Sequence, residues 1–167
     1  MKLISIIGAG RSASSLITYV LDRTEKYNWQ LKVYDQDLDL AKSKTLDHPR
    51  ATAHQIDINN EVARISLIEE SDIVVSMLPA AMHVDVAREC IRFEVPMVTA
   101  SYVSEEMRAL DKQAKDAGII LMNEVGVDPG IDHMSAMKMI DEARDSGATL
   151  ELFESFTGGL LAEQSEK

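Results

Sequence analysis

The sequence predicts an α/β fold built on a doubly wound parallel sheet. Short apolar runs alternate six times with amphipathic, helix-forming segments, and the connections between them are short. The run 73–77 is almost wholly apolar, which is typical of a parallel strand covered on both faces. A glycine turn follows directly on the first apolar run. We therefore expect a single domain whose strands lie in the order 3-2-1-4-5-6.

The boundaries of the expected elements follow from this alternation. Strands are predicted at residues 2–7, 29–34, 51–56, 73–77, 96–100 and 119–122, with a last apolar-rich strand at 148–157. Helices are predicted at residues 12–23, 37–46, 80–93 and 131–146, between Ser104 and Gly118, and over a short stretch whose apolar side carries Val62, Ile65 and Ile68. Ser104 is the expected N-cap of its helix.

The turn Gly8-Ala9-Gly10 separates the first strand from the first helix, which is the context of a dinucleotide-binding site. Gly8 allows a tight turn, and Gly10 leaves a pyrophosphate free to reach the helix N-terminus, where N–H groups and the helix dipole favour an anion. Ala13 is the third small residue of the pattern. Asp35 ends the second strand, where a carboxylate can hold a ribose 2′-hydroxyl; a helix N-cap or a turn residue is the alternative.

Three further loops follow strand ends, where ligands bind in such sheets. Asp57 follows the third strand, where it would meet an adenine ring or cap a helix. Leu78 and Pro79 follow the fourth strand and offer only backbone and apolar surface. Ser101 and Tyr102 place two hydroxyls after the fifth strand, where a phenol can orient a carbonyl or imine or relay a proton. A capped turn with a surface tyrosine is the alternative there.

The loop 123–134 carries an asparagine, several carboxylates and a histidine between the sixth strand and the last helix. Asp128 is expected to project from the ligand end of that strand. No His or Cys pair stands at a recognised spacing, so we expect no metal. His48, His54 and His83 are interpreted as structural or exposed, and Met134, Met137 and Met139 as helix packing.

Composition excludes several function classes. The net charge of −11 argues against binding to nucleic acid or to an anionic membrane surface. No apolar run approaches the ~20 residues that cross a bilayer. The chain enters a strand at once, without a signal or transit pattern, so a cytoplasmic location is expected. Cys90 is the single cysteine and fits a buried structural thiol.

Four motifs together point to a known family. They are Gly-Val-Asp-Pro-Gly-Ile-Asp-His-Met at 126–134, Val-Thr-Ala-Ser-Tyr-Val-Ser at 98–104, Leu78-Pro79, and Gly158-Gly159-Leu160. In these motifs the chain resembles the amino-terminal Rossmann portion of the glutamate-forming saccharopine dehydrogenases, also called saccharopine reductases. The resemblance implies an NAD(P)-dependent oxidoreductase that interconverts saccharopine with glutamate and 2-aminoadipate 6-semialdehyde in lysine metabolism. In that family, NAD(P)H reduces the imine formed between the last two compounds.

The resemblance also assigns residues. The implied cofactor contacts are Gly8, Ala9, Gly10, Arg11, Ser12, Ala13, Asp35, Asp57, Ile58, Leu78, Pro79, Ala100, Val127, Asp128, Pro129, Gly130, Ile131, Asp132, His133 and Met134. The amino-acid substrate would contact Ser101, Tyr102 and Asp128, with Tyr102 and Asp128 as the catalytic pair. Members that prefer NADP carry an arginine after the second strand. Asp35 would instead repel a 2′-phosphate, so NAD is expected, with NADP as the alternative.

The match to this family has limits. Full-length members are more than twice as long and add a substrate-binding, dimerising α+β domain. Residues 1–157 would be the dinucleotide-binding domain, and residues 158–167 the start of a missing substrate domain or a disordered tail. We therefore expect a truncated form that binds cofactor better than it catalyses. Thr157 also replaces the usual cysteine of the family.

Other interpretations of the same site stay open. Lysine dehydrogenase and carboxynorspermidine synthase are related amine oxidoreductases that share the Rossmann half, and a non-catalytic NAD-binding module would keep the same nucleotide site. A homo-oligomer could form through apolar residues of the last predicted strand. These residues are Leu150, Leu152, Phe153 and Phe156.

Overall fold

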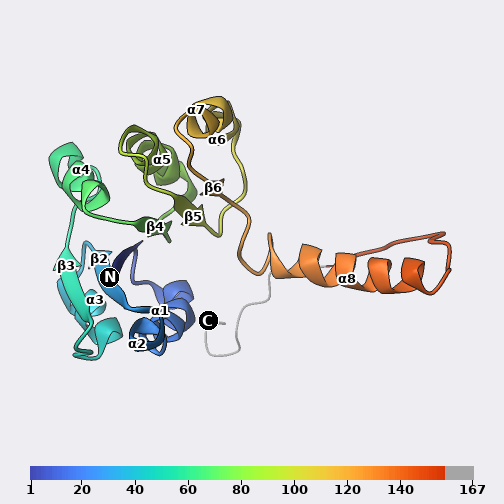
Figure 1. The fold of residues 1–167 in the computed structure, drawn as a ribbon, viewed down its shortest axis with the longest axis horizontal. Helices are drawn as coiled ribbons and strands as arrows, with labels where there is room; N and C mark the ends of the chain where they lie inside the picture. Colours follow the sequence, from blue (N-terminus) through green and yellow to red (C-terminus); the bar gives the residue numbers. More distant parts are fainter. Residues whose placement is uncertain (157–167) are drawn as a thin grey trace, which may run out of the picture. The chain divides into compact units, whose positions relative to one another are not determined.

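The computed structural model describes residues 1–156, and residues 1–132 of it are built on a six-stranded parallel sheet (Figure 1). The strands are β1 (Lys2–Ile7), β2 (Trp29–Asp35), β3 (Ala51–Gln55), β4 (Ile73–Ser76), β5 (Met97–Thr99) and β6 (Leu121–Met122). Their order, β3-β2-β1-β4-β5-β6, confirms the predicted order. Ile4 of the central strand β1 pairs with Leu31 of β2 on one side and with Ile73 of β4 on the other.

The described residues also contain eight helices and two short 3-10 turns, and all but the last helix lie between strands. They are η1 (Arg11–Ala13), α1 (Ser14–Leu21), α2 (Thr24–Tyr27), α3 (Leu38–Thr45), α4 (Glu61–Glu69), η2 (Ala80–Met82), α5 (His83–Arg92), α6 (Glu105–Ala109), α7 (Asp111–Asp116) and α8 (Ile131–Asp145). The Ser104 side chain accepts the Met107 N–H at the start of α6, which confirms the predicted N-cap. Among residues 1–156, no helix combines the length and the apolar character that a bilayer crossing requires.

Two helical layers cover the sheet, with α1 and α3 on one face and α4, α5 and α6 on the other (Figure 1). Successive side chains of a strand point to opposite faces, so Ile6 of β1 packs in the cluster with α1 and Ile7 in the cluster with α5. Both are almost fully buried. This packing fixes the central strands, and with them the loops at their carboxyl ends.

The helices show one wrong prediction and one confirmed one. Val62 was expected on the apolar side of α4 but is 78% exposed, while Leu67 and Ile68 are buried. Val62 precedes Ile68 by six residues, so it lies about 240° around the helix from it and faces solvent. Cys90 of α5 is buried as expected, and burial raises the pKa of its thiol to about 12.

The chain divides into two compact units, Met1–Asp132 and His133–Lys167. Helix α8, which runs on into the second unit, buries none of its side chains, so the expected packing of Met134, Met137 and Met139 is wrong for the described residues. Residues 148–156 form neither helix nor strand, and the strand predicted there is also wrong. An apolar run becomes a strand only where a neighbouring strand pairs with its backbone. Thr157, the motif at 158–160 and the boundary predicted after residue 157 lie outside the described residues.

Candidate functional site

The glycine turn after β1 has the tight geometry that the sequence predicted. Gly8 has a φ of +101°, a conformation that side chains other than glycine rarely adopt. A Cβ atom at this position would lie 2.8 Å from the carbonyl oxygen of Met77, which follows β4. Gly8 is therefore required by the backbone conformation and by the close approach of the two chain segments.

Gly10 differs from Gly8 because the fold itself does not require a glycine there. Its φ of −60° and ψ of 178° suit any residue, and a Cβ atom would meet no protein atom within 4 Å. Gly10 nevertheless lines the cavity described below. The space above it fits a group that approaches the backbone next to η1 and α1, as the pyrophosphate of a dinucleotide does.

Asp35 at the end of β2 is linked to this turn. Its Oδ2 atom accepts the N–H of Ala9 at 2.7 Å, and its Oδ1 atom accepts the N–H of Asp37 at 3.0 Å. The N-cap of α3 is Asp37, whose side chain accepts the N–H groups of Asp39 and Leu40, so Asp35 is not a helix cap. An ionised carboxylate has about four lone-pair positions, which leaves two on Asp35 for hydroxyl donors of a ligand.

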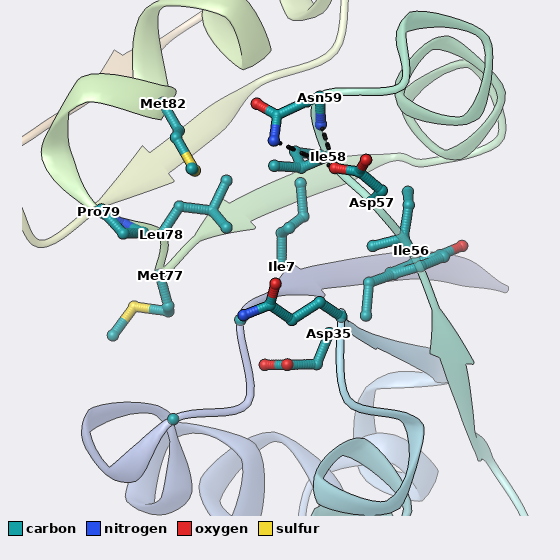
Figure 2. A pocket seen from close by; sticks show the side chains of 14 residues that line it. Ile7, Asp35, Ile56, Asp57, Ile58, Asn59, Met77, Leu78, Pro79 and Met82 are labelled. Carbon is teal, nitrogen blue, oxygen red and sulfur yellow. Dashed lines mark hydrogen bonds between the residues drawn. The ribbon is translucent and has the colours of Figure 1, made fainter.

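The carboxyl ends of β1, β2 and β4 surround a cavity of about 250 Å³ (Figure 2). Leu78 and Pro79 form one apolar side of it, and Ile56 lies on the opposite side. Two carboxylates, Asp35 and Asp57, line it as well. The cavity thus combines apolar walls with acidic groups at strand ends, which suits a flat base and a sugar.

The wall beyond β3 is held by a turn and by a helix. The Oδ1 atom of Asp57 accepts the backbone N–H of Asn59 at 3.0 Å and its side-chain amide at 3.1 Å (Figure 2). The N-cap of α4 is Asn60, so Asp57 stabilises the turn before the helix rather than the helix itself. Arg64 of α4 donates to the carbonyl oxygen of Ile58 at 2.8 Å and thereby holds the loop after β3 in place.

A second group of predicted residues meets where β5 and β6 end. The hydroxyl of Tyr102 donates to Oδ1 of Asp128 at 2.5 Å, and the tyrosine is 62% exposed. This hydrogen bond raises the pKa of the Tyr102 phenol, and the nearby Asp132 and Glu124 carboxylates raise it further. The phenol is therefore a protonated donor at neutral pH, next to a carboxylate that can accept a proton or a hydrogen bond.

The loop that carries Asp128 folds back on itself. Gly126 donates to the carbonyl oxygen of Pro129 at 2.8 Å, and the N–H of Ile131 donates to the carbonyl oxygen of Gly126 at 3.0 Å. Gly130 has a φ of +145°, and a Cβ atom there would lie 2.6 Å from the nitrogen of Gly126. A Cβ atom at Gly126 would in turn press on Ala100, at 3.1 Å. The two glycines thus let this loop close against the loop after β5.

His83, the first residue of α5, was not predicted as part of the site. Its Nδ1 atom lies 2.8 Å from the hydroxyl oxygen of Ser76, and its Nε2 atom lies 2.7 Å from that of Ser101 and 3.2 Å from that of Thr99. The histidine is 3% exposed, and burial lowers the pKa of its imidazole. The sequence signal was its position at the start of a helix seven residues after the end of β4, which is too common to single it out.

The predicted residues thus fall into two groups within the first unit. Lining the cavity are Gly8, Gly10, Asp35, Asp57, Ile58, Leu78 and Pro79. Ala9 binds Asp35, Ala13 is buried beneath the turn, and Arg11 and Ser12 are exposed on η1. The second group contains Ala100, Ser101, Tyr102, Val127, Asp128, Pro129, Gly130, Ile131 and Asp132. His133 and Met134 begin the second unit, so their contact with a cofactor stays a prediction.

Two models of known families match the chain. Residues 4–122 match the saccharopine dehydrogenase NADP binding domain, and residues 126–167 match the saccharopine dehydrogenase C-terminal domain. This chain belongs to the saccharopine dehydrogenase family. The first match covers the glycine turn, the cavity and Tyr102, so the Rossmann-like sheet of this family member is an NAD(P)-binding domain.

Individual saccharopine dehydrogenases and related proteins agree with this assignment. The NADP(+), L-glutamate-forming saccharopine dehydrogenase of Pyricularia oryzae is 35% identical over 164 residues, which are 98% of this chain and 36% of that protein. The mitochondrial alpha-aminoadipic semialdehyde synthase of Rattus norvegicus is 50% identical over 99 residues, 59% of this chain and 11% of that protein. The chain thus spans about a third or less of these relatives.

A solved structure gives the same family and fold. The apo, histidine-tagged, L-Glu-forming saccharopine dehydrogenase from Saccharomyces cerevisiae superposes with a TM-score of 0.79 at 31% sequence identity. The match covers 88% of this chain and 32% of that one. It confirms the predicted family and the predicted α/β fold.

Proposed function

We propose that this chain is the nucleotide-binding portion of a glutamate-forming saccharopine dehydrogenase. The reaction is the NAD(P)-dependent interconversion of saccharopine with glutamate and 2-aminoadipate 6-semialdehyde in lysine metabolism. The observation that carries the proposal is the Asp35 carboxylate bound to Ala9 of the glycine turn, beside a cavity whose floor at Gly10 is open. The name of the Pyricularia oryzae relative, which specifies L-glutamate formation, supports the direction of the chemistry.

We further propose that NAD is preferred over NADP. None of the described residues that line the cavity is Lys or Arg, and two of them are carboxylates. Gln36 follows Asp35 where an arginine would be needed to bind a 2′-phosphate. The name of the Pyricularia oryzae relative gives NADP(+), so the preference proposed here rests on Asp35 and its surroundings alone.

The residues of this chain would bind the cofactor at one end of the site and the amino-acid substrate at the other. Asp35 would hold ribose hydroxyls, while the N–H groups near Gly10 would bind the pyrophosphate. The dinucleotide, when bound, supplies or accepts a hydride. At the other end, the single Tyr102 phenol proton, which is donated to Asp128 here, would turn to the amino-acid substrate. The Asp128 carboxylate, released from that hydrogen bond, would accept a proton or bind an amine.

The decisive experiment follows the absorbance of reduced nicotinamide with saccharopine, lysine and other amines as substrates. Reduction of NAD that depends on saccharopine would support the proposal. Reduction that depends on another amine instead would favour a related amine oxidoreductase. Tight binding of NADH without turnover of any amine would fit both the nucleotide-binding portion of a longer enzyme and a non-catalytic nucleotide-binding module. Failure of the folded chain to bind NADH would contradict the proposal.

A further inference from the structure

The His83 imidazole joins three hydroxyl groups from the ends of neighbouring strands. Ser76 ends β4 and Thr99 ends β5, and both are almost fully buried. Ser101, two residues after β5, is half-buried and is the one member of the three that reaches the surface. Because His83 itself is almost fully buried, its two ring nitrogens have only these hydroxyls as partners among the described residues.

A neutral His83 ring carries one proton, on either Nδ1 or Nε2. The two tautomers can be compared by counting the hydroxyl protons of the neighbouring Ser and Thr side chains that each leaves without an acceptor. A neutral imidazole has one donor nitrogen and one acceptor nitrogen. With the proton on Nε2, the ring donates to Ser101 and accepts from Ser76, and only the Thr99 hydroxyl needs another acceptor. With the proton on Nδ1, Ser101 must donate to Nε2 at 2.7 Å, and both Ser76 and Thr99 are left with buried hydroxyl protons.

A buried donor without an acceptor loses its hydrogen bonds to water and gains none in return. The tautomer protonated at Nε2 leaves fewer such donors and is therefore favoured. The low dielectric around His83 lowers the pKa of the imidazole, which keeps the ring neutral and the choice between two tautomers meaningful. In this tautomer the Ser101 oxygen accepts from His83. The hydroxyl proton of Ser101 is then directed away from the histidine.

We propose that His83 is a positioning residue that fixes the Ser101 side chain as an acceptor from Nε2 and so commits the Ser101 hydroxyl to donate outward. The group that it would donate to is an anionic or carbonyl oxygen of the amino-acid substrate. This last step rests on the proposed function, which places Ser101 on the substrate side. The orientation of Ser101 itself does not depend on it.

The tautomer is measured directly by long-range proton–nitrogen NMR correlations of the histidine rings at neutral pH, on the unmodified chain. The chain has four histidines, so the His83 resonances are assigned by comparison with His48→Gln, His54→Gln and His133→Gln variants. We expect a neutral His83 ring protonated at Nε2. A ring protonated at Nδ1, or at both nitrogens, would overturn the proposal.

Two substitutions of similar size separate positioning from simple packing. The amide nitrogen of His83→Gln can occupy the place of Nε2 and donate to Ser101, whereas the shorter amide of His83→Asn reaches only the place of Nδ1, towards Ser76. We expect three-bond coupling constants to show one Ser101 χ1 rotamer in the parent and in His83→Gln. In His83→Asn, Ser101 should average over rotamers.

An unchanged Ser101 rotamer in His83→Asn would contradict the positioning role. If the variants fail to fold, the tautomer of the unmodified chain still decides. A separate experiment titrates the unmodified chain with NADH. If the chain does not bind NADH, the proposed function is wrong, whereas the tautomer of His83 is measured independently of that result.

Discussion

The two ends of this site are built in different ways. The nucleotide end is made of backbone and strand-end residues that lie next to one another in the sheet, such as Gly8 after β1 and Asp35 at the end of β2. The other end is assembled by side-chain hydrogen bonds between segments far apart in the sequence, namely His83 with Ser101 and Tyr102 with Asp128. Within this second end the burial of the side chains also varies, because His83 is buried while Tyr102 is exposed.

The difference shows which constraints act at each end. At the nucleotide end, strand pairing leaves little freedom, so a substitution there changes either the fold or the affinity in a predictable way. At the other end, the scaffold supplies only the loops, and hydrogen bonds between side chains set their orientation. We therefore expect the largest effects on stability at the glycine turn and the smallest at the tyrosine–aspartate pair.

The largest expected effect is that of Gly8→Ala. An alanine at this position would have an unfavourable positive φ, and its Cβ atom would lie 2.8 Å from the Met77 carbonyl oxygen. We therefore expect a loss of about 3 kcal/mol in the free energy of unfolding. Urea unfolding followed by circular dichroism measures it. Gly10→Ala is the matched control, with an expected change below about 0.5 kcal/mol. Equal losses in the two variants would contradict the different roles of the two glycines.

Gly10→Val should weaken the binding of NADH without lowering the stability of the fold. Its side chain would enter open space beside the first helix, so stability should stay near the parent value. The same side chain would block a pyrophosphate, and we expect NADH affinity to fall at least ~10-fold, which corresponds to about 1.4 kcal/mol. Fluorescence titration with NADH measures this. Unchanged affinity would show that Gly10 does not face the ligand.

Asp35→Ala tests the choice of cofactor. Removing the carboxylate removes the ribose-hydroxyl acceptor and the repulsion of a 2′-phosphate, so the ratio of NADH to NADPH affinity should fall about 10-fold, or about 1.4 kcal/mol. Asp57→Ala removes the other carboxylate of the cavity and serves as the control, which should change both affinities alike. A constant ratio in Asp35→Ala would count against the ribose assignment.

The smallest effect on stability is expected for Asp128→Asn. Tyr102 is largely exposed, so its hydrogen bond should contribute little to folding. The carboxylate raises the pKa of the phenol because it accepts a hydrogen bond from the protonated phenol and would repel the ionised one. Replacing it by a neutral amide should therefore move the Tyr102 titration to lower pH, as followed by carbon NMR of the ring. A titration that stays in place would mean that the two groups are not paired in solution.

The sequence was sufficient to predict the fold and the nucleotide end. The alternation of strand and helix patterns determines the strand order, and the order places Gly8, Asp35 and Leu78 at one edge of the sheet. The sequence could not predict that the Asp35 carboxylate accepts the N–H of Ala9. It also could not exclude a capping role for Asp35. Asp35 and Asp37 both stand just before α3, and only their hydrogen bonds show that Asp37 is the N-cap while Asp35 binds Ala9.

Predictions failed where they depended on partners distant in sequence. His83 looked isolated because its hydroxyl partners come from two other strand ends, 7 and 18 residues away. The apolar run at 148–156 has the composition of a strand but forms none, and the methionines of α8 are exposed. Apolar composition indicates that a segment is suited to burial, whereas the neighbour that buries it has to come from elsewhere in a protein.

Calorimetric titration of the folded chain with NADH and with NADPH tests the central claim most directly, because the claim is that the glycine turn and Asp35 bind a nicotinamide dinucleotide. We expect saturable binding with NADH the tighter ligand, by roughly tenfold. Absence of heat with both dinucleotides, from a sample with the circular dichroism of a folded α/β protein and at two temperatures, would contradict it.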